Sequence, residues 1–242
     1  MSPTPEQRAY ARLAGICFLA NYVLQMLGDS VTIIFRGGKP FADTARYVIE
    51  NKLLWRVCLL EVGLAWISIG ILAFALYVVL EPVDRRLAQL ALCLRLGASF
   101  VGAASLTFRV ANARLYEAFA TPGLFTTEQL RTLVAAMTRG GSEGVELAWM
   151  FQATGSVLFF LLFLRSRFIP AWMARLAIFG SAVVVAMSVA MFLYPQYIAP
   201  LKLAGLPGFA AEVATAIWLL TKGLRPSSAG TGPTISPSVS TA

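Results

Sequence analysis

Residues 13–35 read LAGICFLANYVLQMLGDSVTIIF and decide the structural class of this protein. The stretch is long and apolar enough to form a membrane-spanning helix, which needs about 20 residues. Asn21, Gln25 and Asp29 recur in it every four residues, so an α-helix places all three on one face. A carboxylate in hydrocarbon costs roughly 2.5–3.5 kcal/mol. This face must therefore contact protein or trapped water instead of lipid.

The composition extends this interpretation to the whole chain. Of its 242 residues, 58% are hydrophobic and 13% are charged, whereas a soluble domain carries roughly 25% charged residues. Repeated apolar runs near 20 residues are typical of membrane helices. After a cytoplasmic lead at 1–12, we expect an all-α domain at 13–222, a polytopic integral membrane bundle. Its six predicted transmembrane helices are 13–35, 53–80, 86–111, 143–164, 172–193 and 206–222.

The connection 112–142 is the longest interruption between predicted spans. Within it, Thr126 and Gln129 have the spacing of a capping box, which predicts that a helix begins there. One face of that helix is apolar and carries Leu130, Leu133, Val134 and Met137. We expect it to be a short helix in the membrane interface, between the third and fourth spans. A shorter amphipathic piece is expected around 44–50, and the Ser-, Pro- and Thr-rich segment 223–242 predicts a disordered cytoplasmic tail.

The formal net charge of +8 comes from Lys and Arg residues in loops and at helix ends. These residues are denser near the spans on the side that holds both termini, which predicts that both termini are cytoplasmic. No basic stripe is interleaved with aromatic residues, so we expect the lipid bilayer, and not nucleic acid, as the partner. The sequence makes no prediction of the oligomeric state.

Residues that carry most metal and cofactor chemistry are scarce. The chain has no His, which excludes haem held by paired His, His-containing zinc sites and His-based catalytic triads. Its three cysteines, Cys17, Cys58 and Cys93, form no CxxC motif and lie in apolar runs, so we interpret them as packing residues. We predict no cofactor and no metal. Ligation of a metal by the carboxylates of Asp29 and Glu61 is the alternative left open.

Four acids interrupt four of the predicted spans, namely Asp29, Glu61, Glu146 and Glu212. A rise of about 1.5 Å per residue places them in the same outer third of the bilayer, so we expect them to share one chamber. The alternative is a belt of salt bridges near the interface. Arg95 has no carboxylate at its own predicted depth. The residues expected to bind a substrate in the chamber are Asn21, Gln25, Trp66, Arg109, Asn112, Glu146, Trp149, Gln152 and Trp218.

Short motifs at the cytoplasmic helix ends point to a family. The segment LRSRFIPAW at 164–172, followed by RLAIFG at 175–180, resembles a bacterial family of six-helix membrane proteins known only as a domain of unknown function and common in actinobacteria. RLAG at 12–15 and ALYVVLEPV at 75–83 carry the same resemblance, which covers roughly 8–224. The resemblance implies a topology and a location in the bacterial inner membrane, but no catalytic residues.

The buried acids favour an intramembrane enzyme acting on a lipophilic isoprenoid. A protonated carboxylic acid in an apolar site can protonate an alkene or epoxide, and aromatic rings then stabilise the carbocation. We expect Glu61 to be this acid, with Asp29 and Glu212 as further candidates. The reaction would be an isomerase or lyase reaction, by analogy with small membrane terpenoid cyclases. No motif of those enzymes is present. A binding or transport protein for a small lipophilic molecule, and a structural or regulatory membrane protein, are the alternatives.

Overall fold

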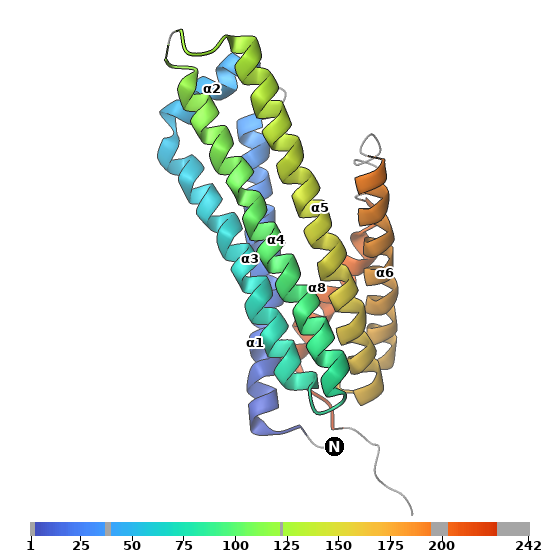
Figure 1. The fold of residues 1–242 in the computed structure, drawn as a ribbon. Helices are drawn as coiled ribbons and strands as arrows, with labels where there is room; N and C mark the ends of the chain where they lie inside the picture. The colour runs from blue at the N-terminus through green and yellow to red at the C-terminus, as the bar shows by residue number, and fades with distance from the viewer. Residues whose placement is uncertain (1–2, 37–39, 122, 195–202, 227–242) are drawn as a thin grey trace, which may run out of the picture.

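The structure, a computed structural model, describes residues 3–36, 40–121, 123–194 and 203–226, with the side chains of 29–36 left out. All regular secondary structure in the described residues is helical (Figure 1). The helices are α1 (Pro5–Arg36), α2 (Phe41–Glu50), α3 (Lys52–Leu80), α4 (Arg85–Ala118), α5 (Thr127–Ser166), α6 (Ala171–Leu193) and α8 (Leu206–Thr221).

Five of these helices, α1, α3, α4, α5 and α6, are long and apolar enough to cross a membrane. The predicted all-α membrane bundle is thereby confirmed. Six full-length spans are not confirmed, because α8 has only 16 residues and a straight crossing needs about 20. The start of α1, the α3–α4 turn and the α5–α6 turn lie at one end of the bundle, here called the terminal end (Figure 1). The other, the distal end, holds α2 and the α4–α5 connection.

The main core lies in the terminal half of the bundle, where small residues let the helices approach closely. Ala11 and Ala14 of α1 and Ala174 and Ala177 of α6 are almost completely buried in it. A close approach of two backbones joins α6 to α8, where a Cβ atom added to Gly180 would lie 2.5 Å from the Cα of Gly208. This contact fixes α8 against α6 and so fixes the side chains that α8 presents to the interior.

The long helices α4 and α5 correct the prediction for 112–142. At 34 and 40 residues they measure about 51 and 60 Å, well above the hydrocarbon thickness of about 30 Å. The capping box is confirmed, since Thr126 Oγ1 accepts from Gln129 N at 3.2 Å and Gln129 Oε1 accepts from Thr126 N at 2.9 Å. The helix it starts is not a separate interfacial helix, because it continues without a break to Ser166.

A second, smaller core explains why the polar half of α5 stays helical. Val134 of α5 packs in it with Val48 of α2, Trp55 of α3 and Tyr116 of α4. The apolar face predicted for the interfacial helix is therefore covered by protein at the distal end. The amphipathic piece expected around 44–50 is the helix α2, whose Val48 joins the same cluster.

The chain after α8 packs against the terminal end for a few residues. Leu224 is buried, and Arg225 N donates to Phe168 O at 2.9 Å. The first residues of the predicted disordered tail, 223–226, therefore contact the bundle. The remainder, 227–242, lies outside the described residues.

Candidate functional site

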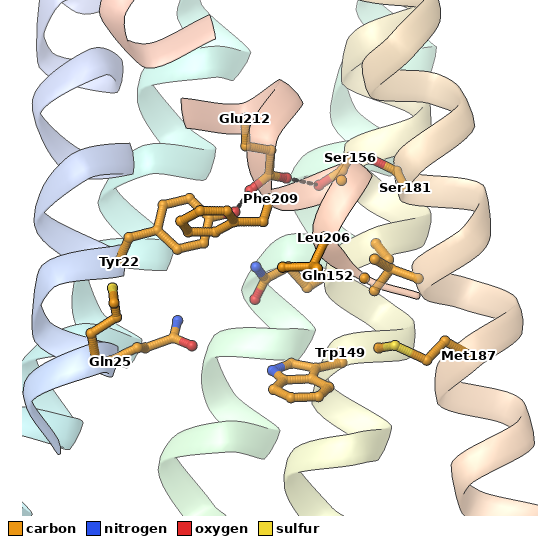
Figure 2. A pocket seen from close by; sticks show the side chains of 15 residues that line it. Tyr22, Gln25, Trp149, Gln152, Ser156, Ser181, Met187, Leu206, Phe209 and Glu212 are labelled. Atoms are coloured by element: carbon orange, nitrogen blue, oxygen red, sulfur yellow. Dashed lines mark hydrogen bonds between the residues drawn. The ribbon is translucent and has the colours of Figure 1, made fainter. Parts of the chain in front are cut away.

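A cavity of about 340 Å³ lies between α1, α5, α6 and α8 (Figure 2). Most of its wall is apolar. Figure 2 shows Tyr22, Ser156 and Glu212 at one end of the cavity, and Gln25 and Trp149 further along it. The lining residues are Tyr22, Gln25, Met26, Trp149, Gln152, Ala153, Ser156, Ser181, Val184, Met187, Gly205, Leu206, Gly208, Phe209 and Glu212.

A hydrogen-bonded network around Glu212 closes the polar end. Tyr22 Oη donates to Glu212 Oε2 at 2.5 Å, and Ser156 Oγ donates to Oε1 at 3.1 Å. Ser156 in turn accepts a hydrogen bond of 2.5 Å from Arg95 Nη1. The same Nη1 lies 3.8 Å from Glu212 Oε1. Side chains from α1, α4, α5 and α8 are thus connected through one carboxylate.

Arg95 is the most deeply buried charge of this network, with 1% of its surface exposed. Its guanidinium lies 5.8 Å from the centre of the Phe18 ring. The glycine at 155 makes room for it, because a Cβ atom there would lie 2.7 Å from Arg95 Cγ. Burial of a charge requires a partner of opposite sign, and Glu212 supplies it.

This pair corrects the expectation that Arg95 has no carboxylate at its depth. Arg95 follows Arg85, the first residue of α4, by ten residues, and Glu212 precedes Thr221, the last residue of α8, by nine residues. The expected depth of Glu212 was counted from the distal side, on the assumption that its helix crosses the whole bilayer. Because α8 has 16 residues, it begins part-way across the bundle and its middle lies level with Arg95.

Two side-chain amides flank the middle of the cavity. Gln25 Nε2 donates to Asn21 Oδ1 at 2.6 Å, and Asn21 Nδ2 donates to Ala65 O at 2.9 Å and to Ser68 Oγ at 3.3 Å. The predicted polar face of the first span is therefore anchored on α3 and orients Gln25 at the cavity. The Oε1 atom of Gln152 is buried and has no hydrogen-bond partner among the described residues.

Residues 13–223 match the sequence profile of a domain of unknown function, DUF4386. The chain belongs to the DUF4386 family. The resemblance inferred from the motifs at 12–15, 75–83 and 164–180 is thereby confirmed. No curated protein and no solved structure shows significant similarity to the chain. The family match covers every helix that lines the cavity but assigns it no activity.

In this DUF4386 protein, four predicted site residues line the cavity together: Gln25, Trp149, Gln152 and Glu212. Asn21 lies directly behind Gln25. The predicted catalytic residue Glu61 is half-buried on α3, where its Oε2 lies 4.0 Å from a Cβ atom added to Gly28. The side chain of Asp29 lies outside the described residues. Glu212 is thus the one predicted catalytic acid described in the cavity wall.

The other predicted substrate-binding residues lie elsewhere. Trp66 packs between α3 and α4, where a Cβ atom added to Gly102 would lie 2.4 Å from its ring. Glu146 is buried on α5, ten residues from Ser156, which is about 15 Å along the helix. Trp218 lies under the guanidinium of Arg225, 4.5 Å from its ring centre.

Two predicted residues lie on the distal part of α4. Asn112 is buried and its Nδ2 donates to Thr138 Oγ1 of α5 at 3.0 Å. Arg109 lies three residues before it, half-buried. Neither residue lines the cavity. The acids and amides predicted to share one chamber are therefore distributed along the bundle, with one group of them at the cavity.

Sequence reasoning missed Ser156, Ser181 and Phe209 as cavity residues and Arg95 as a member of the network. Serine in an apolar run carries little signal, because it also packs without any functional role. Arg95 did carry a signal, because it and Glu212 lie at nearly the same distance from the terminal ends of their helices. Among the described residues, no group of three or more Cys, Asp or Glu side chains is arranged to hold a metal ion.

Proposed function

We propose that this protein binds a small lipophilic molecule in the cavity between α1, α5, α6 and α8. The observation that carries the proposal is a mainly apolar cavity of about 340 Å³ that ends in the fixed polar group of Tyr22, Ser156 and Glu212. Ligand sites of membrane and soluble proteins have this composition, apolar walls with a few placed polar groups, and begin near 300 Å³.

The lining favours a neutral ligand with one hydrogen-bonding end. The walls are formed by side chains such as Met26, Val184, Met187 and Phe209. The buried Gln152 Oε1 has no described partner, and a ligand hydroxyl or amide N–H would satisfy it. The charge of Glu212 is already balanced by Arg95, so a charged ligand gains no new ion pair here.

Acid catalysis on an isoprenoid requires a carboxylic acid that can donate a proton to the substrate, whereas binding does not. Glu212 accepts from Tyr22 and Ser156 and pairs with Arg95. Both of its oxygens are therefore already engaged by side chains of neighbouring helices. The arrangement favours a binding or transport role over a terpenoid cyclase in which Glu212 is the acid.

The proposal is tested by asking what stays bound to the gently purified protein. We expect native mass spectrometry in a mild detergent to show wild-type protein with a stoichiometric small-molecule adduct. Val184→Phe should lose the adduct, because Val184 lines the cavity and the larger ring fills it. Val189→Phe is the matched control, since Val189 lies on the same helix with 36% exposure and outside the cavity. Wild-type protein without an adduct, or equal retention in both variants, would contradict the proposal.

The polar end is tested by a second pair of variants. Gln152→Leu should weaken adduct retention by about two- to thirteenfold, the effect of one hydrogen bond worth about 0.5–1.5 kcal/mol. Gln89→Leu makes the same chemical change on an exposed face of α4 and should leave retention unchanged. Equal retention in the two would exclude Gln152 as a ligand contact.

A further inference from the structure

A second pocket, of about 280 Å³, lies at the distal end between α2, α3 and α4. It is distinct from the cavity and shares no residue with it. Its floor is apolar, formed by Trp55, Leu59, Val110 and Ala113, and its rim is charged. The rim residues are Lys52, Arg56, Arg114 and Glu117.

The rim has an excess of positive charge. Lys52 Nζ lies 3.4 Å from Glu117 Oε1, and Arg114 Nη1 lies 3.2 Å from Glu117 Oε2. One carboxylate is thus shared by two cations. Arg56 is exposed and forms no ion pair with an acid of the described chain. Three cations against one acid leave two positive charges around one pocket.

The exposed surface of α3 gives the depth of this pocket relative to a bilayer. Large apolar side chains are exposed along this helix from Leu53 to Phe74, a length of about 32 Å. That length matches the hydrocarbon thickness of about 30 Å. Lys52 lies one residue beyond the distal edge of this apolar stretch, and Arg56 lies within one helical turn of that edge. The charged rim therefore lies where hydrocarbon gives way to headgroups.

We propose that this pocket binds the phosphate headgroup of an anionic phospholipid. The phosphate lies against Arg56, with Lys52 and Arg114 completing the positive rim. Val57 and Leu60 are exposed on α3, next in sequence to the pocket residues Arg56 and Leu59, and would contact an acyl chain. Basic pockets between membrane helices bind lipid headgroups in this way, and Arg suits phosphate because its planar fork donates two hydrogen bonds.

Lipid counting on the full-length protein tests this site. In a non-ionic detergent, native mass spectrometry measures the binding of added phosphatidylglycerol and phosphatidylcholine. We expect one phosphatidylglycerol to bind with clear preference. Arg56→Gln should weaken it about fivefold, the effect of about 1 kcal/mol per basic residue at a membrane surface. Arg139→Gln removes the same charge from an exposed position on α5, paired with Glu143 and outside the pocket, and should leave binding unchanged.

Each alternative outcome has a distinct result. Equal binding of the two lipids, or equal loss in Arg56→Gln and Arg139→Gln, overturns the proposal. Displacement of phosphatidylglycerol by millimolar inorganic phosphate identifies a free phosphate site and also overturns it. Because the pocket shares no residue with the cavity, failure here is independent of the small-molecule proposal.

Discussion

In the middle of the bundle, Arg95 of α4 pairs with Glu212 of α8, whereas at the distal end Arg139 pairs with Glu143 one turn away on α5. The first pair is buried, with side-chain exposures of 1% and 10%, and the second is exposed, at 68% and 44%. Buried pairs are costly to form and very costly to break, while exposed pairs contribute little. Arg95 and Glu212 therefore hold helices together, whereas Arg139 and Glu143 contribute little to the stability of the bundle.

The network in the interior also joins more helices than any distal pair. Glu212 is bonded to Tyr22 of α1 and Ser156 of α5 as well as to Arg95. The distal pairs Arg114–Glu117 and Arg131–Glu128 each stay within one helix. Loss of the Glu212 carboxylate should therefore loosen four helices at once. Variants of the interior network should lower the free energy of unfolding more than variants of the distal pairs.

The largest effect is expected for Glu212→Ala. Removing one partner of a buried pair leaves Arg95 uncompensated and should cost about 3–5 kcal/mol of unfolding free energy. Thermal unfolding in detergent should show a large fall in Tm or loss of the folded protein. The double variant Arg95→Met/Glu212→Gln should recover much of the loss, because neither charge is then stranded. If Glu212→Ala unfolds like wild type, the pair does not hold the bundle.

Tyr22→Phe should have the next largest effect. It keeps the ring that packs edge-on against Phe209, 4.6 Å between centres, and removes only the hydroxyl bonded to Glu212. A hydrogen bond to a charged group is worth about 1.5–3 kcal/mol. Chemical denaturation should show this loss. Tyr194→Phe, at an exposed position at the end of α6, is the control and should be neutral.

Gly180→Ala tests the contact that positions α8. The new Cβ atom would meet backbone, the Cα of Gly208 at 2.5 Å, so α6 and α8 must separate at a cost of about 1–3 kcal/mol. We also expect weaker adduct retention, because both helices line the cavity. Gly63→Ala is the matched control, since its Cβ atom would meet a side chain, Leu106 Cδ1, at an ordinary 3.6 Å. A neutral Gly180→Ala would contradict the close packing.

Most of the fold follows from apolar runs and caps, and the exceptions have a common cause. The starts of α4 and α5, at Asp84 and Thr126, carry recognisable caps. The sequence predicts a helix from Thr126 but not its unbroken continuation into the next span, because the residues TRGGSE at 138–143 interrupt the apolar pattern. This part of α5 stays helical because α2 and α4 pack against its apolar face. Such tertiary packing is not visible in the local sequence.

The site was predictable in part for the same reason. Gln25 and Gln152 are polar residues in long apolar runs, and both line the cavity. The partner of Arg95 was missed because the depth of Glu212 was counted from the start of α8, which lies part-way across the bundle and not at the distal membrane face. Ser156, which joins Arg95 to Glu212, gives no signal, since its neighbours on α5 are ordinary small and apolar residues.

The smallest effect on the free energy of unfolding is expected for the exposed pair of Arg139 and Glu143 at the distal end. Arg139→Gln breaks the exposed pair with Glu143, whose worth is about 0.2–1 kcal/mol at most. Unfolding free energy measured at low and high salt should change little and should differ less between wild type and variant at high salt, because salt screens exposed charges. Glu212→Ala should keep its deficit at both salt concentrations, since the buried pair is screened far less. A salt-dependent deficit in Glu212→Ala would place Arg95 and Glu212 in contact with water and would erase the distinction between the two regions.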